Sequence, residues 1–216
     1  MKKINILFDL DGTLIDSTHA ILESFGVAYQ NMNQNKPDDE LIKAQIGHPL
    51  EDMFVTLGVD RNEVEAFVYH YKMHYRKINQ AMTTLLPYAK EAIEEAHRVA
   101  HLAVVTTKTS QYAIELLKHL GVFDYFDAFV GRDDVEFPKP HPEPILKALK
   151  ALNNGYSSWM IGDTCMDMQS AKAANINAIG VECGYVSLEE LKKCSTIIKS
   201  DALEAVNVVI SYNIGD

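Results

Sequence analysis

The stretch Ile4-Asn5-Ile6-Leu7-Phe8-Asp9-Leu10-Asp11-Gly12-Thr13 decides how this chain is organised. Its first five residues form a short, mostly apolar run, which is typical of a buried strand. Two carboxylates follow directly where that strand ends, and ligands of α/β sheets bind at the carboxyl ends of strands. Asp-Gly is also a common turn signal, and Asp or Thr can cap a following helix. The stretch by itself therefore leaves a structural turn and a ligand site both open.

Length and charge restrict the possible functions. The chain has 216 residues, of which 47% are hydrophobic, enough for one α/β domain or for a core with a small second module. The formal net charge of -10 argues against a nucleic-acid partner, because a nucleic-acid backbone is itself anionic. An anionic small-molecule substrate would need cations placed locally in its site.

The three cysteines, Cys165, Cys183 and Cys194, have no paired spacing. This pattern predicts a reducing compartment without a disulfide framework, and it predicts that Cys165 is an inert thiol. No stretch of the sequence is long and uncharged enough to span a bilayer. We therefore expect a cytoplasmic protein with no membrane partner.

The hydrophobic pattern divides the chain into two parts. Residues 15–81 show helical spacing and no clear strand, which predicts a helical insert. From Leu85 onward strands and helices alternate, with strands expected at 102–105, 128–130, 159–161 and 178–181. Repeated βα units predict a doubly wound, mainly parallel sheet with helices on both faces. The expected domains are an α/β core of residues 1–14 and 82–216 and a helical domain of residues 15–81.

Further candidate residues lie near the ends of later strands. Thr106 ends one strand, where its hydroxyl could donate to a phosphate oxygen, although threonine is also ordinary in strands and Thr107 or Thr109 could cap the next helix. Lys139 lies between Pro138 and Pro140, and these prolines stiffen its backbone. This context predicts a lysine that neutralises anionic oxygens in an acidic site.

A third strand-end acid is Asp163, in Gly162-Asp163-Thr164-Cys165-Met166-Asp167. Thr164 and Asp167 have the spacing of a helix capping box, which accounts for those two residues but leaves Asp163 unexplained. Three buried acids at strand ends require a cation to offset their charge, and hard divalent cations take oxygen ligands.

These four signals occur in the order found in the haloacid dehalogenase (HAD) superfamily of phosphohydrolases, which the chain resembles over essentially its whole length. They are Asp9-x-Asp11-Gly12-Thr13, Thr106, Lys139 before Pro140, and Gly162-Asp163-x-x-x-Asp167. The insert resembles the small α-helical cap of that superfamily. The segments Ile46 to Leu50, Thr106-Thr107-Lys108 and Asp133 to Pro144 look like the phosphoglycolate phosphatase and pyrophosphatase PpaX-like group.

The resemblance implies a role for each matching residue and Mg²⁺ as cofactor. Asp9 is implied as nucleophile and metal ligand, and Asp11 as general acid and base whose backbone carbonyl also binds the metal. The remaining roles are metal ligand for Asp163, orientation of the metal site for Asp167, and phosphate binding for a set of four residues: Gly12, Thr106, Thr107 and Lys139. Gly47 and His48 are expected in the cap loop nearest the substrate.

The resemblance implies a Mg²⁺-dependent phosphatase acting on a small phosphate monoester such as 2-phosphoglycolate. Inorganic pyrophosphatase is the alternative, since Thr107 occupies a position where many phosphoglycolate phosphatases have Asn. Dehalogenase activity is not expected because Asp11 is present. A sugar phosphomutase is disfavoured because Ile21 stands where mutases carry a cap histidine. A non-catalytic phosphate-binding protein of this fold is disfavoured because both Asp9 and Asp11 are intact.

Overall fold

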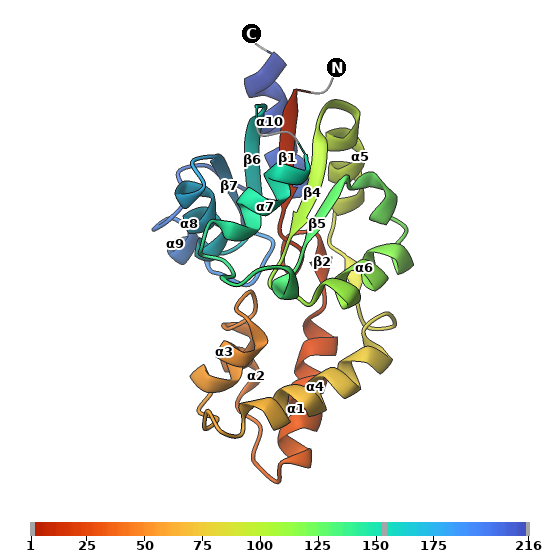
Figure 1. Ribbon diagram of the computed structural model, residues 1–216, viewed down its shortest axis with the longest axis vertical. Helices are drawn as coiled ribbons and strands as arrows, with labels where there is room; N and C mark the ends of the chain where they lie inside the picture. The colour runs from red at the N-terminus through yellow and green to blue at the C-terminus, as the bar shows by residue number, and fades with distance from the viewer. Residues whose placement is uncertain (1–2, 153–154, 215–216) are drawn as a thin grey trace.

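Strand β1 (Ile4–Phe8) lies in the middle of a six-stranded parallel sheet whose order is β5-β4-β1-β6-β7-β8 (Figure 1). The computed structural model describes residues 3–152 and 155–214. The other strands of the sheet are β4 (His101–Val105), β5 (Ala128–Val130), β6 (Ser157–Gly162), β7 (Asn177–Val181) and β8 (Ile198–Lys199). Every neighbouring pair is parallel, so the predicted α/β fold with a mainly parallel sheet is confirmed.

The two faces of the sheet are covered by different helices. Alternate residues of β1 point to opposite faces, so that Ile6 and Phe8 join one apolar cluster and Leu7 joins another. The first cluster is completed by α5 (Ala89–Val99), α6 (Ser110–His119) and α10 (Ala202–Ile214), and the second by α7 (Glu143–Ala151) and α8 (Cys165–Ala173). A strand that is buried on both faces explains the nearly continuous apolar run at the start of the sequence.

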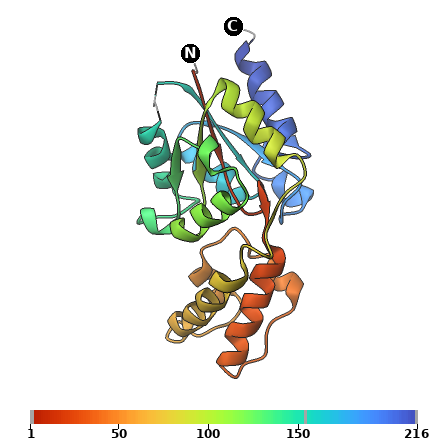
Figure 2. The same ribbon diagram turned by 90° about the vertical axis from the view of Figure 1, so that its right-hand side faces the viewer.

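Four helices form a separate lobe beyond the carboxyl ends of the strands (Figures 1 and 2). They are α1 (Thr18–Asn31), α2 (Asp39–Lys43), α3 (Leu50–Thr56) and α4 (Val64–Ile78). The helices pack around their own apolar cluster, in which Phe25, Phe54 and Phe67 are fully buried. In the described part of the chain, no helix combines the length and the apolar character needed to cross a bilayer.

Two short strands connect the lobe to the sheet domain. Strand β2 (Ile15–Asp16) pairs antiparallel with β3 (Thr84–Leu85) at the two points where the chain passes between the domains. The expectation that the insert contains no strand is therefore wrong at its first two residues. A two-residue strand is too short to produce an alternating pattern, so periodicity could not have revealed it.

The prediction that the three cysteines are unpaired is also wrong. Cys165 and Cys194 form a disulfide across 29 residues of sequence, with their Cα atoms 5.6 Å apart, and Cys183 remains a free thiol. The partners come from α8 and from the turn after the short helix α9 (Leu188–Leu191). Only the packing of these elements brings the two residues together, so the spacing in the sequence gives no sign of the pair.

Candidate active site

Three buried carboxylates meet at the edge of the sheet that faces the helical lobe. Asp9 directly follows β1, Asp163 directly follows the neighbouring strand β6, and Asp167 lies in the first turn of α8. Each offers an oxygen within 4.8 Å of the other two, and none is more than 3% exposed. The three acids are up to 158 positions apart in the sequence. They meet in the structure because parallel strands end at the same edge of the sheet.

Lys139 lies among these acids. Its Nζ is 2.8 Å from Asp9 Oδ1, and it donates to Asp167 Oδ1 at 2.5 Å and to the carbonyl of Val105 at 3.1 Å. Burial alone would lower the pKa of Lys139, but the charges of Asp167 and Asp9 raise it above its ordinary value. The ammonium therefore stays charged next to the proposed nucleophile.

Asp167 makes both the helix-capping and the ion-pair contacts. Its Oδ2 accepts hydrogen bonds from the backbone N–H of Thr164 at 3.0 Å and from its hydroxyl at 2.7 Å, which completes the capping box expected from the sequence. Its Oδ1 accepts from Lys139. Asp167 accepts three hydrogen bonds, one of them from the lysine ammonium, which favours orientation of the lysine over direct binding of a metal.

Asp163 has a different set of partners. Its Oδ1 accepts from the hydroxyl of Thr13 at 3.1 Å and its Oδ2 accepts from the backbone N–H of Tyr185 at 2.9 Å. These bonds fix the carboxylate while leaving lone pairs on both oxygens.

The cluster holds three carboxylates but one ammonium, that of Lys139. This excess of negative charge favours the binding of a metal ion. Burial raises the pKa of Asp9 to about 7, with Lys139 opposing the shift and Asp167 adding to it. Burial and the charges of Asp9 and Asp167 also raise the pKa of Asp163. A second positive charge would favour the ionised forms of both acids. The donor set is made of oxygens alone, which fits a hard divalent cation such as Mg²⁺.

Gly12 allows the loop after β1 to approach Asp163. Its φ is +80°, and a Cβ on this residue would lie 2.4 Å from Asp163 Oδ2. Its N–H donates to the carbonyl of Ile15 at 2.9 Å. The N–H of Gly12 is thus engaged within the turn, and the residue contributes space to the site.

Asp11 points to a different set of groups from Asp9. Its Oδ1 accepts a short hydrogen bond from the hydroxyl of Ser17, and its Oδ2 lies 3.1 Å from Lys108 Nζ. Lys108 also donates to the hydroxyl of Tyr75 on α4 at 2.9 Å. The charge of Asp11 and the hydroxyl of Tyr75 raise the pKa of Lys108 well above its ordinary value, although burial opposes the shift.

Sequence reasoning missed Ser17, Lys108 and Tyr75 as site residues. Ser17 directly precedes α1, but its hydroxyl makes no cap bond and donates to Asp11 instead. The position of Lys108 two residues after Thr106 was the one available signal. Nothing in the local pattern around Tyr75 distinguishes it from the other apolar positions of α4.

The two threonines after β4 face different partners. Thr106 is buried, and its hydroxyl accepts from the N–H of Lys108 at 3.1 Å, which leaves the hydroxyl proton available for donation. Thr107 donates its hydroxyl to the carbonyl of Gly47 in the helical lobe at 2.8 Å. Thr107 thus links the sheet domain to the predicted cap loop, in which the Nδ1 of His48 lies 3.0 Å from the carbonyl of Gln45.

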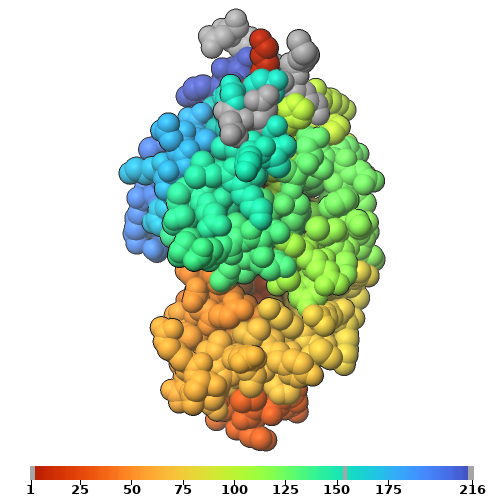
Figure 3. Space-filling view, viewed as in Figure 1, coloured from red at the N-terminus to blue at the C-terminus, as the bar shows by residue number. Residues whose placement is uncertain are grey.

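A cavity of about 80 Å³ lies between the sheet domain and the helical lobe. It is lined by Asp11, Thr107 and Lys108 from the sheet domain and by Gly47 and His48 from the lobe. Further apolar and charged residues complete the lining, among them Lys72 and Arg132. Figure 3 shows a hollow at this junction on the visible face of the molecule. The part of the site next to Asp11 is therefore enclosed from both sides.

The chain matches known proteins over most of its length. Residues 6–181 match the family described as haloacid dehalogenase-like hydrolase. "Probable phosphatase IndB" of Dickeya dadantii is 35% identical over 208 residues, covering 93% of this chain and 90% of that protein. "Pyrophosphatase PpaX" of Halalkalibacterium halodurans is 36% identical over 191 residues, covering 86% and 85%.

A solved structure gives the same result. A haloacid dehalogenase-like family hydrolase from Streptococcus pneumoniae superimposes with a TM-score of 0.84 at 27% identity, covering 95% of this chain and 97% of that one. The resemblance inferred from the four sequence signals is confirmed at the level of the family. This chain belongs to the haloacid dehalogenase-like hydrolases.

Proposed function

We propose that this protein is a Mg²⁺-dependent phosphatase that hydrolyses a small organic phosphate monoester through an aspartyl-phosphate intermediate. The observation that carries the proposal is the placement of Asp9, whose carboxylate lies 2.8 Å from Lys139 and beside Asp163 and Asp167. Phosphoryl transfer depends mainly on positioning and on neutralising charge, and this arrangement provides both.

Asp9 would act as the nucleophile. One carboxylate oxygen attacks the phosphorus, the bond to the leaving oxygen breaks, and the phosphoryl group becomes bound to Asp9. The ammonium of Lys139 and the hydroxyl proton of Thr106 would contact the phosphoryl oxygens, which reduces the repulsion between two anions.

Asp11 would supply and remove protons. It protonates the leaving oxygen in the first step and takes a proton from the water that hydrolyses the intermediate in the second. The bonds from Ser17 and Lys108 orient its carboxylate toward the cavity in which the leaving group would lie.

Asp9, Asp163 and the backbone carbonyl of Asp11 would bind Mg²⁺, with Asp167 orienting the site. When bound, the ion supplies positive charge close to the oxygens of the phosphoryl group.

The cavity supports a small leaving group. Its volume of about 80 Å³ holds more than one water-sized group and is bounded by both lobes. Glycolate and phosphate each have five non-hydrogen atoms, whereas a nucleoside is several times larger. Lys108 is the cation beside Asp11 and would favour a leaving group that carries its own negative charge.

Two substrates meet these requirements, and we favour 2-phosphoglycolate over inorganic pyrophosphate. The pyrophosphatase named among the relatives supports the alternative. The PpaX-like position of Thr107 does not decide between them, because its hydroxyl contacts Gly47 and not the expected phosphate position.

The decisive experiment measures phosphate release from 2-phosphoglycolate, pyrophosphate, a sugar monophosphate and a nucleoside monophosphate, each with Mg²⁺ and with EDTA. We expect turnover that requires Mg²⁺ and a kcat/KM that is highest for 2-phosphoglycolate. Highest activity on pyrophosphate would establish the alternative. Accumulation of a sugar bisphosphate with slow phosphate loss would indicate a mutase, and no turnover of any phosphate compound would refute the phosphatase proposal.

A further inference from the structure

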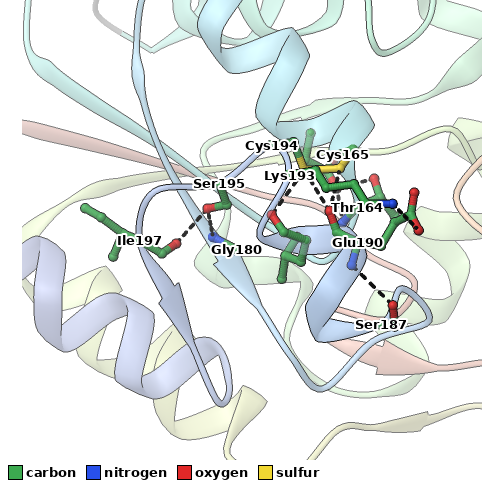
Figure 4. Close-up of a disulfide and its surroundings, with 11 residues drawn as sticks. Thr164, Cys165, Gly180, Ser187, Glu190, Lys193, Cys194, Ser195 and Ile197 are labelled. Carbon is green, nitrogen blue, oxygen red and sulfur yellow. Dashed lines mark hydrogen bonds and ion pairs between the residues drawn. A yellow bond between two sulfur atoms is a disulfide. The ribbon is translucent and has the colours of Figure 1, made fainter.

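The disulfide lies beside the candidate metal site. Cys165 is the first residue of α8, two residues after Asp163 and directly after Thr164, whose N–H and hydroxyl bind Asp167. Cys194 lies in the turn after α9, and the bond between the two sulfurs joins that turn to the start of α8 (Figure 4).

The disulfide restrains the segment between β7 and β8, residues 182–197. Near the start of this segment the N–H of Tyr185 donates to Asp163 Oδ2 at 2.9 Å. The hydroxyl of the same tyrosine accepts from the hydroxyl of Thr18 on α1 at 3.2 Å. One tyrosine in the restrained segment thus contacts both the acid that would bind the metal and the helical lobe.

Backbone hydrogen bonds, one short helix and the buried side chain of Leu191 hold the far part of the segment. Helix α9 has four residues and is capped by a 3.3 Å bond from Glu190 N–H to the hydroxyl of Ser187. Leu191 is buried against Gly180, and Ser195 bonds to Gly180 and to Ile197 (Figure 4). A short helix with one buried side chain opens more easily than a long one, so the covalent bond makes a large contribution to its order.

Neither cysteine of the disulfide is fully buried. Cys165 and Cys194 are each half-buried. The neighbouring Glu190 and Lys193 form an ion pair whose side chains are 58% and 69% exposed. Thiol–disulfide exchange requires that a thiolate reach one sulfur of the pair, and neither cysteine is fully buried.

We propose that Cys165 and Cys194 are a reversible thiol oxidation site whose state controls the order of residues 182–197 and, through Tyr185, the affinity of Asp163 for its metal. The metal part of this inference rests on the proposed function, whereas the thiol chemistry does not. The oxidant is a low-molecular-weight disulfide, RSSR. One cysteine sulfur bonds to a sulfur of RSSR and releases one RSH, and the second cysteine then displaces the other RSH, so two Cys–SH and RSSR give Cys–S–S–Cys and two RSH.

The first test counts thiols. The folded protein is incubated with either oxidised glutathione or dithiothreitol, alkylated in denaturant and weighed by mass spectrometry. We expect one alkylated cysteine, Cys183, after oxidation and three after reduction, with the change reversed by exchanging reagents. Three thiols under both treatments, or one under both, would overturn the proposal. The Cys183→Ser variant should give no alkylated cysteine after oxidation and two after reduction.

The second test compares the two redox states of the folded protein. In the reduced form we expect trypsin to cut faster after Lys192 and Lys193, both exposed in the segment, while cleavage after Lys172 on α8 is unchanged. We also expect the Mg²⁺ concentration needed for a fixed rise in Tm, such as about 3 °C, to increase about tenfold in the reduced form, because loss of a group that orients a metal ligand weakens metal binding by at least about that factor.

Controls separate these effects from the reagents and from the proposed function. The Cys165→Ser/Cys194→Ser double variant should behave like the reduced wild type under both treatments. Equal cleavage in both redox states would overturn the control of the segment even if the thiols interconvert. A protein whose Tm responds to Mg²⁺ in neither state, but whose cleavage depends on redox state, would refute the metal assignment and support the thiol site.

Discussion

Individual side chains in this site satisfy two requirements each. Asp167 caps α8 through Thr164 and also binds Lys139. Lys108 pairs with Asp11 and also donates to the hydroxyl of Tyr75 in the helical lobe. A sequence pattern typical of a helix cap and one typical of a site can therefore describe the same residue, so recognising one role does not exclude the other.

Asp9→Asn keeps the shape of the side chain and removes the nucleophilic carboxylate. We expect kcat for p-nitrophenyl phosphate with saturating Mg²⁺ to fall at least about 10³-fold, equivalent to about 4 kcal/mol of the activation barrier. Asp60→Asn, on the exposed surface of the helical lobe, is the control and should keep full activity. A folded Asp9→Asn protein with a tenth of the wild-type rate would contradict the nucleophile assignment.

Lys108→Met removes the cation that lies beside Asp11 and lines the cavity. A hydrogen bond to a charged group contributes about 1.5–3 kcal/mol, so we expect the preference for 2-phosphoglycolate over 2-hydroxyethyl phosphate to fall about 10- to 100-fold. The two esters are similar in size and differ in the charge of the leaving group, and kcat/KM is measured for each. Lys90→Met on α5 should leave the ratio unchanged. An unchanged ratio in Lys108→Met would show that Lys108 does not contact the leaving group.

At the scale of the elements, the loop after β1 must pass close to the end of β6. Gly12 permits this approach because it has no Cβ and has a positive φ. The loop also contains Thr13, which fixes Asp163 through its hydroxyl. The geometry of the acid cluster therefore depends on the backbone of one turn as much as on the acids themselves.

Comparing Gly12→Ala with Gly121→Ala separates the effect of backbone strain from the effect of the close approach between residue 12 and Asp163. Both glycines have a positive φ, +80° and +72°, but a Cβ at residue 121 meets nothing within 4 Å. Gly121→Ala should lower the free energy of unfolding by about 1–2 kcal/mol from strain alone, and Gly12→Ala by more because its Cβ also meets Asp163, both measured by urea denaturation. Only Gly12→Ala should also abolish the rise in Tm with Mg²⁺, because its Cβ displaces Asp163. A normal Mg²⁺ response in Gly12→Ala would contradict this account.

At the scale of the whole molecule, two separately packed lobes enclose the cavity beside Asp11. Thr107 contacts Gly47, and Lys108 contacts Tyr75, so both residues after Thr106 connect the sheet domain to the helical lobe. The residues that would recognise the leaving group thus come from both lobes. We therefore expect the distance between the lobes to limit the size of the substrate.

The buried acids also make stability depend on pH. The pKa of Asp9 rises from its ordinary value of 3.8 to about 7 in the folded protein, so the folded state binds this proton more tightly than the unfolded state. The stability that it contributes is present at low pH and is lost as the pH rises from about 4 to about 7. For one proton the free energy of unfolding falls by about 1.4 kcal/mol per pH unit in this range. For a chain of this size, that lowers Tm by roughly 3–5 °C per pH unit.

We therefore expect the Tm of the metal-free protein to fall between pH 5 and pH 7, and Mg²⁺ to raise Tm more at pH 8 than at pH 5. Differential scanning fluorimetry in EDTA and in Mg²⁺ measures both trends. Asp9→Asn should show a shallower decline in EDTA, since it lacks the titrating carboxyl. A wild-type Tm that rises over this range with the same slope as the variant would argue against the burial of an ionisable Asp9.

Apolar periodicity was sufficient to predict the parallel sheet, and the rule that parallel strands end at one edge explains why Asp9 and Asp163 could be expected together. Lys139 lies nine residues after the end of β5, so that rule does not apply to it, and its flanking prolines were the signal that predicted its role. Only the tertiary structure decided that Ser17 and Lys108 bind Asp11, that the cavity is small, and that Cys165 is paired with Cys194. Those contacts join loops and helix ends from different parts of the chain, and such contacts depend on packing distances that leave no periodic pattern in the sequence.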